Sequence, residues 1–323
     1  GYFKENKKKN NRRYNQKFLT ELVRCNPQKD KKACGLLQLS ISVPSDILYK
    51  KYFYRSGVNS TMKNHLYGIA KNIKNIFKNK NKINILDIGC NDGTLLKFFP
   101  KKFIKYGVDP SDSFPKKGIK NIRYYKDFFP SKKLPNKIKF DVITSIAMFY
   151  DLEDPSLFVN HIYNILKTEG VWIFEVSYMP EMLKLNSYDT ICHEHLEYYS
   201  LQVIQKIVSI NKMKIAKVEF NKSNGGSIRC FITKEENFIL GTLKDNIKIN
   251  EIIKDELKAG LNTSVPYKKF KNRVSKIKIK LKRLIGNLNK RGKSVHVYGA
   301  STKGNTILQF CKINNKMIKY ASD

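Results

Sequence analysis

Two histidines that flank a glutamate are the first residues in this sequence whose types and spacing suggest chemistry. His193, Glu194 and His195 stand in the string DTICHEHLEYYS, residues 189–200. A neutral imidazole has an ordinary pKa of about 6.5, so it can remove a proton at neutral pH. In an extended chain both rings would point to one side and Glu194 to the other. The string therefore predicts a catalytic acid/base site.

Neighbours in this string could assist such a base. Glu194 or Glu197 could orient the imidazole, and Tyr198 or Tyr199 could donate a hydrogen bond to a developing oxyanion. Two alternatives remain open. Cys192 and the histidines are metal-ligand types, although adjacent residues seldom converge on one tetrahedral ion. The histidines could also serve only the hydrogen bonds of a loop.

A second candidate site is the string ILDIGCNDGTLL, in which an acid ends an apolar strand and glycines follow. Gly89 and Gly93 come after Asp87 in a D-x-G-x-x-x-G spacing, with Cys90 and Asn91 between them. A glycine directly after a parallel strand lets the backbone approach a ligand, because no Cβ stands in the way. Doubly wound folds bind cofactors at this edge of the sheet. These residues are predicted to bind a cofactor, unless the glycines serve only a tight turn.

Two later aspartates extend this prediction. Asp109 ends the next expected strand, 20 residues after Gly89, where a carboxylate can accept hydrogen bonds from both hydroxyls of a ribose. Asp127 follows the third strand and could face the amino group of an adenine. The dinucleotide fingerprint G-x-G-x-x-G is absent, which disfavours an NAD site. The loop closely resembles motif I of S-adenosylmethionine (SAM) methyltransferases, and GVDPS resembles their second motif.

The elements that must position these residues alternate between strands and helices. An alternating order of this kind predicts an α/β fold with a doubly wound parallel sheet and helices on both faces. Five strands, then a helix and a hairpin pair, is the order of a class I SAM methyltransferase domain. We expect strands over 83–89, 104–109, 121–125, 140–146, 170–177, 214–220 and 227–233, and helices over 62–77, 94–99, 156–166 and 201–210.

The chain beyond residue 235 has a different pattern. Lys-rich helices are expected over 243–260 and 267–289, followed by a strand (294–300), a helix (305–312) and a last strand, which make a partial second α/β lobe. In GASTKGN, backbone N–H groups at the helix start could hold a phosphate, with Lys303 and Asn305 beside it. The string lacks the ending of a P-loop, so a plain strand-to-helix turn is the alternative.

The composition limits the classes of protein that need to be considered. The chain has 323 residues and a formal net charge of +35, which could indicate a nucleic-acid binder. Nearly all the basic residues are lysine, and Asn, Ile, Phe and Tyr are also frequent, so an A+T-rich genome is the simpler explanation. No apolar run is long enough to span a membrane. Six scattered cysteines are too few for a disulfide scaffold, and they favour a reduced, cytoplasmic setting.

Five strings taken together resemble the sugar C-methyltransferase family, which acts on nucleotide-linked keto-deoxysugars. The resemblance runs from about residue 18 to the end of the chain. It implies a zinc-binding lobe, a SAM domain and a Rossmann-like lobe, and we expect them over 1–60, 61–235 and 236–323. The strings are YRSGVNSTMKNHL (54–66), ILDIGCNDG (85–93), HEHLEYYSL (193–201), NGGSIR (224–229) and YGASTKGNT (298–306).

The resemblance also implies roles for individual residues. It makes His195 the base that removes a proton next to a keto group, so that the enolate attacks the methyl group of SAM. Glu194 is linked to the same site, and Tyr52 and Tyr54 line the sugar pocket. Tyr150 stands where the family often has a histidine near the sugar. The loop with Lys303 and Asn305 would contact the diphosphate of the nucleotide sugar.

Three cysteines bear on the metal content and the acceptor. Cys25 and Cys34 correspond to the family's second zinc-binding cysteine pair; the first pair would lie before residue 1. Two thiolates cannot complete a four-coordinate structural site, so we expect no metal in this chain and zinc only in a longer protein. The family often has Tyr at the position of Cys192, so a different sugar or acceptor atom is conceivable.

The chain reads as a fragment, because residue 1 is not Met and the string MIKYASD reads as a strand with nothing following it.

Alternative functions follow from the same features. The charge motivates an RNA methyltransferase, but no RNA-binding motif with interleaved aromatic residues is evident. Another small molecule methylated on oxygen or nitrogen is a further alternative, and a non-catalytic nucleotide-binding protein is disfavoured by the intact H-E-H and SAM strings. The expected partner is a small nucleotide-sugar substrate, with no nucleic acid and no membrane. The oligomeric state is not predicted.

Overall fold

The structure is a computed structural model that describes residues 18–50, 52, 54–299 and 301–322. Residues 1–17 of the predicted N-terminal lobe and residue 300 of the predicted strand over 294–300 lie outside the described residues. The chain forms two compact units. The sheet unit consists of Val43–Ser177 and Tyr199–Asp255, and the three-segment unit of Gly1–Ser42, Tyr178–Tyr198 and Glu256–Asp323.

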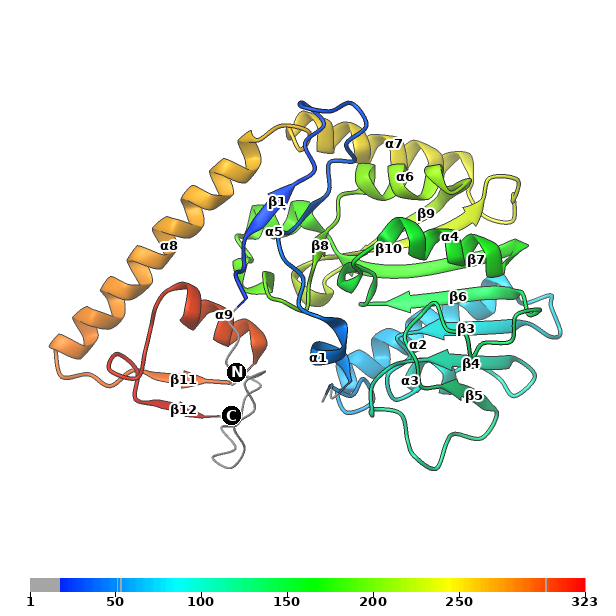
Figure 1. Ribbon diagram of the computed structural model, residues 1–323, viewed down its shortest axis with the longest axis horizontal. Coiled ribbons are helices and arrows are strands. Elements are labelled where there is room, and N and C mark those ends of the chain that lie inside the picture. The colour runs from blue at the N-terminus through cyan, green and yellow to red at the C-terminus, as the bar shows by residue number, and fades with distance from the viewer. Residues whose placement is uncertain (1–17, 51, 53, 300, 323) are drawn as a thin grey trace. The chain divides into compact units, whose positions relative to one another are not determined.

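The sheet unit contains a seven-stranded sheet in the order β5-β4-β3-β6-β7-β10-β9 (Figure 1). The first five strands run parallel, and β10 is antiparallel to both of its neighbours. The predicted doubly wound α/β fold is confirmed. The strands are β3 (Asn84–Ile88), β4 (Ile104–Val108), β5 (Ile122–Tyr125), β6 (Phe140–Ile146), β7 (Leu166–Ser177), β9 (Met213–Asn221) and β10 (Ser227–Lys234).

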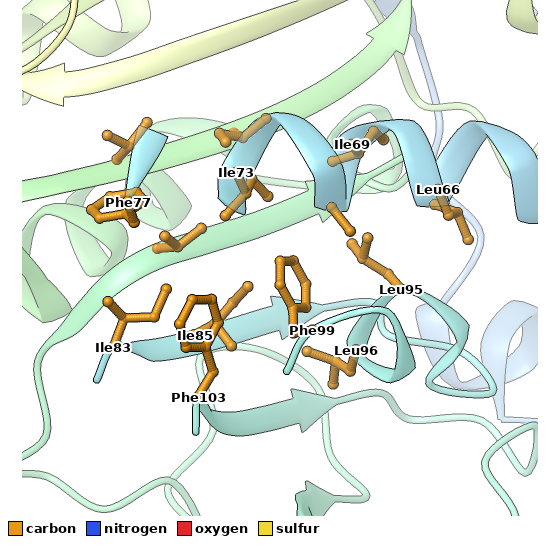
Figure 2. Packing of buried hydrophobic residues seen from close by; sticks show 14 of the residues in the cluster. Leu66, Ile69, Ile73, Phe77, Ile83, Ile85, Leu95, Leu96, Phe99 and Phe103 are labelled. Atoms are coloured by element: carbon orange, nitrogen blue, oxygen red, sulfur yellow. The ribbon is translucent and has the colours of Figure 1, made fainter. Parts of the chain in front are cut away.

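Helices cover both faces of this sheet, as predicted. Helix α2 (Ser60–Ile76) starts where the Asn59 side chain accepts hydrogen bonds from two backbone N–H groups, and with α3 (Thr94–Lys97) it covers one face. Its apolar residues recur at three and four positions, so they form one stripe that packs on β3 (Figure 2). Helices α4 (Pro155–Ile165) and α6 (Leu201–Ile210) pack on the opposite face, and Trp172, Phe174 and Phe149 fill that layer. A short α1 (Ser45–Tyr49), which the sequence analysis did not place, precedes α2.

Strand β7 is longer than predicted. It begins at Leu166, directly after α4, instead of at residue 170, because Leu166 already pairs with Phe140 of β6. Its first residues are stabilised at the surface by the ion pair between Lys167 and Asp141 (2.8 Å). An apolar-run criterion misses this start, since Lys167, Thr168 and Glu169 follow Leu166.

The three-segment unit gathers parts of the chain that are far apart in sequence. Its sheet has the order β1-β2-β8, from β1 (Leu22–Arg24), β2 (Leu37–Leu39) and β8 (Glu197–Tyr198). Its core joins Leu37, Tyr198 and α5 (Met179–Leu185) to apolar residues of α8 (Val265–Lys290). The segment after β7, Tyr178–Tyr198, is therefore part of this second unit.

The C-terminal elements follow the predicted βαβ order. Strands β11 (His296–Tyr298) and β12 (Tyr320–Ser322) pair in parallel, with α9 (Thr302–Phe310) between them. Helix α9 starts earlier than residue 305, because the Ser301 side chain caps it by accepting from the Gly304 N–H. The Lys-rich helices are α7 (Leu243–Lys258) and α8, and Pro266 lies in the first turn of α8. No helix within the described ranges is long and apolar enough to cross a membrane.

Candidate active site

The predicted cofactor loop begins at a buried carboxylate. Asp87 lies at the carboxyl end of β3 and is 3% exposed, and the Thr144 hydroxyl on β6 donates to it at 2.6 Å. The pKa of Asp87 is raised to about 7, mainly by burial and also by the nearby Asp109 carboxylate, while the Thr144 hydrogen bond opposes both. Asp87 can therefore be either protonated or ionised near neutral pH.

The two glycines of the loop are needed for their backbone conformation and for space. Gly89 and Gly93 have φ angles of +71° and +73°, in the left-handed region. A Cβ on Gly89 would lie 3.0 Å from Cγ of Met148, and one on Gly93 would lie 2.8 Å from the Phe114 ring. The Gly89 and Cys90 N–H groups donate to the Val108 carbonyl, at 2.8 and 3.2 Å. A side chain at either glycine would therefore strain the turn.

The carboxylate of Asp109 fixes the backbone of the cofactor loop through hydrogen bonds. It accepts hydrogen bonds from the Asn91 N–H at 2.8 Å and from the Ser111 N–H at 2.8 Å, and also from the Ser111 hydroxyl. Carboxylate oxygens have further lone pairs, so contact with a ribose stays a prediction. Asp127 likewise accepts from the Phe128 N–H, and its N–H donates to the Asp109 carbonyl.

Cys90 fills space under the loop. It is 4% exposed, and its Sγ lies only 2.7 Å from where a Cβ on Gly107 would be. Burial raises the pKa of the Cys90 thiol well above its usual range, and the charges of Asp87 and Asp109 act in the same direction. Cys90 therefore supports the loop as an apolar side chain.

A segment that carries two predicted substrate tyrosines is tied to this loop. The Ser56 N–H donates to Asn91 Oδ1 at 3.0 Å, and Asn91 Nδ2 donates to the Tyr54 carbonyl at 2.9 Å. The Tyr52 and Tyr54 rings lie 6.4 Å apart between centroids. Burial raises the pKa of Tyr54, and the charge of Asp92 raises it further. Both tyrosines thus belong to the surroundings of the cofactor loop.

Asp92 and Gly57 are loop contacts that the sequence analysis missed. The Gly57 N–H donates to Asp92 Oδ2 at 2.8 Å, while the other oxygen of Asp92 accepts from the Thr94 N–H and hydroxyl. A Cβ on Gly57 would lie 2.7 Å from both Asp92 and Thr94. The sequence contained a hint of this contact, since the S-G of the first string and the N-D-G of the loop both belong to the resemblance.

A buried polar cluster on the same unit was also missed. His65 Nε2 lies 2.7 Å from Glu175 Oε1; Arg229 donates to Oε2 through Nε and Nη2 at 3.0 and 2.8 Å, and Asn221 donates there at 2.9 Å. Arg229 also contacts Glu219 at 3.2 Å. Burial alone would raise the pKa of Glu175, but the His65 hydrogen bond and the charge of Arg229 lower it.

Two other predicted residues lie in the core of the sheet unit. Tyr150 is 7% exposed and lies in a single 3₁₀ turn, Phe149–Asp151, after β6. Tyr199 is fully buried; its hydroxyl donates to the Phe149 carbonyl at 3.4 Å, and its ring stacks on Phe149 at 5.1 Å. Tyr199 therefore packs against the 3₁₀ turn that carries Tyr150.

The H-E-H string belongs to the three-segment unit, and its backbone differs from the expectation. Residues 192–195 form a turn, closed by the His195 N–H donating to the Cys192 carbonyl at 3.0 Å, so the extended alternation of side chains is wrong. His193 Nε2 lies 3.1 Å from the Phe18 carbonyl. His195 Nδ1 lies 2.9 Å from the Thr190 carbonyl. Carbonyls only accept, so each of these nitrogens carries a hydrogen, and in a neutral His195 ring the lone pair is on Nε2.

The neighbours of His195 are largely shielded from water. Tyr198 donates its hydroxyl hydrogen to the His195 carbonyl at 3.1 Å. Burial raises the pKa of Glu194, although the two histidines oppose this. The pKa of the Cys192 thiol is raised to about 11, mainly by burial and also by the charge of Glu194, while Lys303 of α9 opposes both.

The remaining predicted residues of this unit lie on α9 and at the N-terminal hairpin. Lys303 and Asn305 are half-buried in the first turns of α9, and the Asn305 N–H donates to the Ser301 carbonyl. Cys25 and Cys34 are half-buried at the ends of the turn that joins β1 and β2. Burial raises the pKa of Cys34, and the adjacent Cys25 thiol raises it further. The described residues contain no group of three or more potential metal ligands.

Comparisons with known proteins identify methyltransferases as relatives of this chain. A model described as "Methyltransferase domain" matches residues 61–209, and "C-methyltransferase C-terminal domain" matches residues 222–323. C-methyltransferase NovU from Streptomyces niveus is 24% identical over 304 residues, which are 90% of this chain and 70% of NovU. The chain is a SAM-dependent methyltransferase.

Other relatives of this methyltransferase share shorter or more distant likenesses. The tRNA U34 carboxymethyltransferase of Campylobacter lari is 30% identical over 117 residues, 30% of this chain and 36% of that protein. Among solved structures, YcgJ of Bacillus subtilis has a TM-score of 0.41 and 16% identity, over 53% of this chain and 99% of YcgJ. ChlM of Synechocystis, with bound SAH, has a TM-score of 0.43 and 14% identity, over 55% of this chain and 88% of ChlM.

The residues at the loop fit the SAM cofactor of the methyltransferase. Gly89 and Gly93 have no side chains. A Cβ on Gly89 would crowd Met148, and one on Gly93 would crowd Phe114. Asp87, Asp109 and Asp127 supply carboxylates beside it, and a carboxylate can accept hydrogen bonds from an amino group or from ribose hydroxyls. The chain therefore provides acceptors of the kind that the amino group and ribose of SAM require.

Proposed function

We propose that this methyltransferase methylates a carbon of a nucleotide-linked keto-deoxysugar. The likeness to NovU spans 90% of the chain, and the C-methyltransferase model covers its last third. The observation that carries the proposal is the hydrogen bond of His195 Nδ1 to the Thr190 carbonyl, because it gives Nε2 the lone pair that a base needs.

In the proposed mechanism, the protein removes and stabilises charge while the cofactor is held in place. SAM supplies an electrophilic methyl group on a sulfonium. His195 Nε2 takes the proton from the carbon next to the ketone, and Glu194 stabilises the imidazolium that forms. Tyr52 and Tyr54, with Tyr150 and Tyr198, are proposed to contact the sugar. Tyr199, which stacks on Phe149 in the core, completes the set of proposed contacts.

We also propose a division into three lobes, a diphosphate contact, a zinc site and a cytoplasmic setting. We divide the chain into an N-terminal lobe (1–60), a SAM domain (61–235) and a C-terminal lobe (236–323); the helix start with Lys303 and Asn305 would hold the diphosphate. Zinc would bind Cys25 and Cys34 together with two further ligands, and their adjacent thiols support this. The six free cysteines support a reducing, cytoplasmic setting.

A product analysis tests the proposed function. The chain is incubated with SAM and a panel of dTDP-, GDP- and CDP-linked keto-deoxysugars, and products are examined by mass and NMR. We expect one sugar to gain a methyl group bonded to carbon. A methyl group on oxygen or nitrogen, or no product with the whole panel, would overturn the proposal.

An RNA acceptor is the second candidate, because the net charge is +35 and a tRNA carboxymethyltransferase shares 117 aligned residues. A protein that tracks phosphates binds RNA with a steep dependence of log affinity on log salt. Binding of a tRNA at several salt concentrations separates the two candidates. A flat dependence, or no binding near physiological salt, would eliminate the RNA acceptor.

A further inference from the structure

A row of charged side chains crosses the sheet unit on the face that α2 covers. Glu175 on β7 is in register with Arg229 on β10, and Arg229 with Glu219 on β9. Side chains two residues apart on a strand share a face. Ile173 and Phe231, two positions away, belong to the core under α2, so the charged row lies on that same face. His65 of α2 contacts the row from above.

This row is level with the cofactor loop. Asp87 at the end of β3 is in register with Thr144 on β6, and Thr144 with Ile173 on β7. Glu175, two residues further along β7, is therefore level with Gly89. One strand, β6, separates β3 from β7, so the two backbones are about 10 Å apart. A methyl acceptor bound beside the loop on this face would meet the row.

The two ring nitrogens of His65 are used differently. Nε2 donates to the Glu175 carboxylate at 2.7 Å. The polar contact of Nδ1 is with the Ser223 hydroxyl at 3.5 Å, which is too long for a strong hydrogen bond. The His65 side chain is 16% exposed. A carboxylate that fixes one nitrogen, while the other faces a ligand, is the arrangement of an acid/base histidine.

Charged side chains from β9 and β10 surround the contact between His65 and Glu175. Glu175 and Glu219 face Arg229, and Lys217 pairs with Glu219 at 2.8 Å. The formal charges of these two carboxylates and two cations sum to zero. A protonated His65 would add one positive charge directly beside the Glu175 carboxylate. Two members of the cluster, His65 and Arg229, come from NHL in the first string and NGGSIR in the fourth, which the cofactor loop does not use.

We infer that His65 is a second acid/base residue of the methyl transfer and that its Nδ1 contacts the oxygen of the acceptor. The inference rests on the proposed function. As the carbon beside the ketone loses its proton to the base, the protonated His65 ring gives its Nδ1 proton to the ketone oxygen and keeps the Nε2 hydrogen bonded to Glu175. The proton returns to Nδ1 when the carbonyl re-forms, so His65 ends the cycle unchanged. The acceptor class is a carbonyl compound that forms an enol.

His65→Gln tests this inference in the intact chain. Gln can still donate to Glu175, so the cluster and the fold should persist, but it cannot exchange a proton. We expect turnover of the sugar that wild type accepts to fall about 100-fold, within the usual worth of an acid/base residue. SAM affinity by calorimetry should change less than twofold, and the fall of wild-type turnover at high pH should be absent in the variant.

Two further variants guard against a purely structural effect. His161→Gln changes a histidine of α4 whose ring contacts Phe129, and it should leave turnover and SAM affinity unchanged. Glu175→Gln keeps the shape but removes the carboxylate charge. It should lower turnover about tenfold and move the high-pH fall to lower pH, because His65 loses the charge that favours its protonated form.

The outcomes separate the inference from the function on which it rests. If wild type methylates carbon and His65→Gln keeps turnover within threefold with the same pH profile, the inference is wrong and the function stands. A loss that follows SAM affinity would likewise overturn it. If wild type forms no product with the panel, both fall. If His65→Gln does not fold, Glu175→Gln decides by the same pH readout.

Discussion

The cofactor loop and the H-E-H string were both recognised from a few letters, yet only the loop has the backbone that its letters predict. In the loop, Gly89 and Gly93 adopt left-handed angles and directly follow a strand. In the H-E-H string, a turn replaced the expected extended chain. Glycine spacing after a strand reports local backbone geometry. A pair of histidines indicates only side-chain chemistry. Its backbone conformation depends on contacts with residues far away in the sequence.

The largest expected effect is on turnover, and it tests the side-chain chemistry of the H-E-H string. His195→Ala should lower turnover by about 10² to 10⁴, the usual worth of a positioned acid/base residue. SAM affinity should not change, because His195 is proposed to act on the acceptor. His193→Ala should cost less, since Nε2 of His193 is hydrogen-bonded to the Phe18 carbonyl. Equal losses in the two variants would contradict the assigned roles.

Gly89→Val tests the backbone half. A β-branched residue at a φ of +71° is strained, and its Cβ would crowd Met148. SAM affinity measured by calorimetry should fall at least about 100-fold, the sum of such strain and a lost backbone approach. The matched control is Gly118→Val, at a φ of +70° with nothing near its Cβ. If both variants bind SAM equally well, the loop is not the cofactor site.

Asp87→Asn should change the pH dependence of stability. Between its ordinary value of 3.8 and about 7, the folded protein retains a proton on Asp87 that the unfolded chain has released. Wild-type stability therefore falls as pH rises through that window. The free energy of unfolding of the variant, relative to wild type, should increase from pH 4 to pH 8 by about 1–4 kcal/mol. Urea melts without SAM measure it; a constant difference would contradict the raised pKa.

Asp109→Ala should weaken SAM by about 1–3 kcal/mol, the range for hydrogen bonds to a charged group. The carboxylate also holds the Asn91 and Ser111 N–H groups, so the loop loses its support as well. Asp112→Ala is the control on the same loop, because its exposed ion pair with Lys126 should contribute little. Comparable losses in the two variants would show that charge near the loop, and not the Asp109 contact, matters.

Most of the sheet unit could be predicted because its pattern is local. Apolar runs marked the strands, and stripes at three and four marked α2 and α6, so the order and most bounds followed from adjacent letters. The three-segment unit could not be assembled in this way. Its core joins Leu37, Met179 and Phe270, and nothing in the sequence near one of them indicates the others.

The same distinction explains which site residues were missed. Asp87 and Gly89 are adjacent in sequence and in space, so one string revealed them. His65, Glu175 and Arg229 belong to three elements, and each alone is an unremarkable polar residue on a helix or strand. Only the register of β7 with β10 brings the carboxylate and the guanidinium together. A pattern of single letters cannot encode that pairing.

Hydrogen exchange at the acceptor carbon tests the central claim most directly, because it needs no methyl transfer. Wild-type protein with an inert SAM analogue and the accepted keto-sugar is placed in deuterated water, and NMR follows the proton next to the ketone. We predict that this proton exchanges with solvent, and that His195→Ala abolishes the exchange. A wild-type protein that transfers methyl groups from SAM, yet shows no such exchange, would contradict carbon methylation through an enolate.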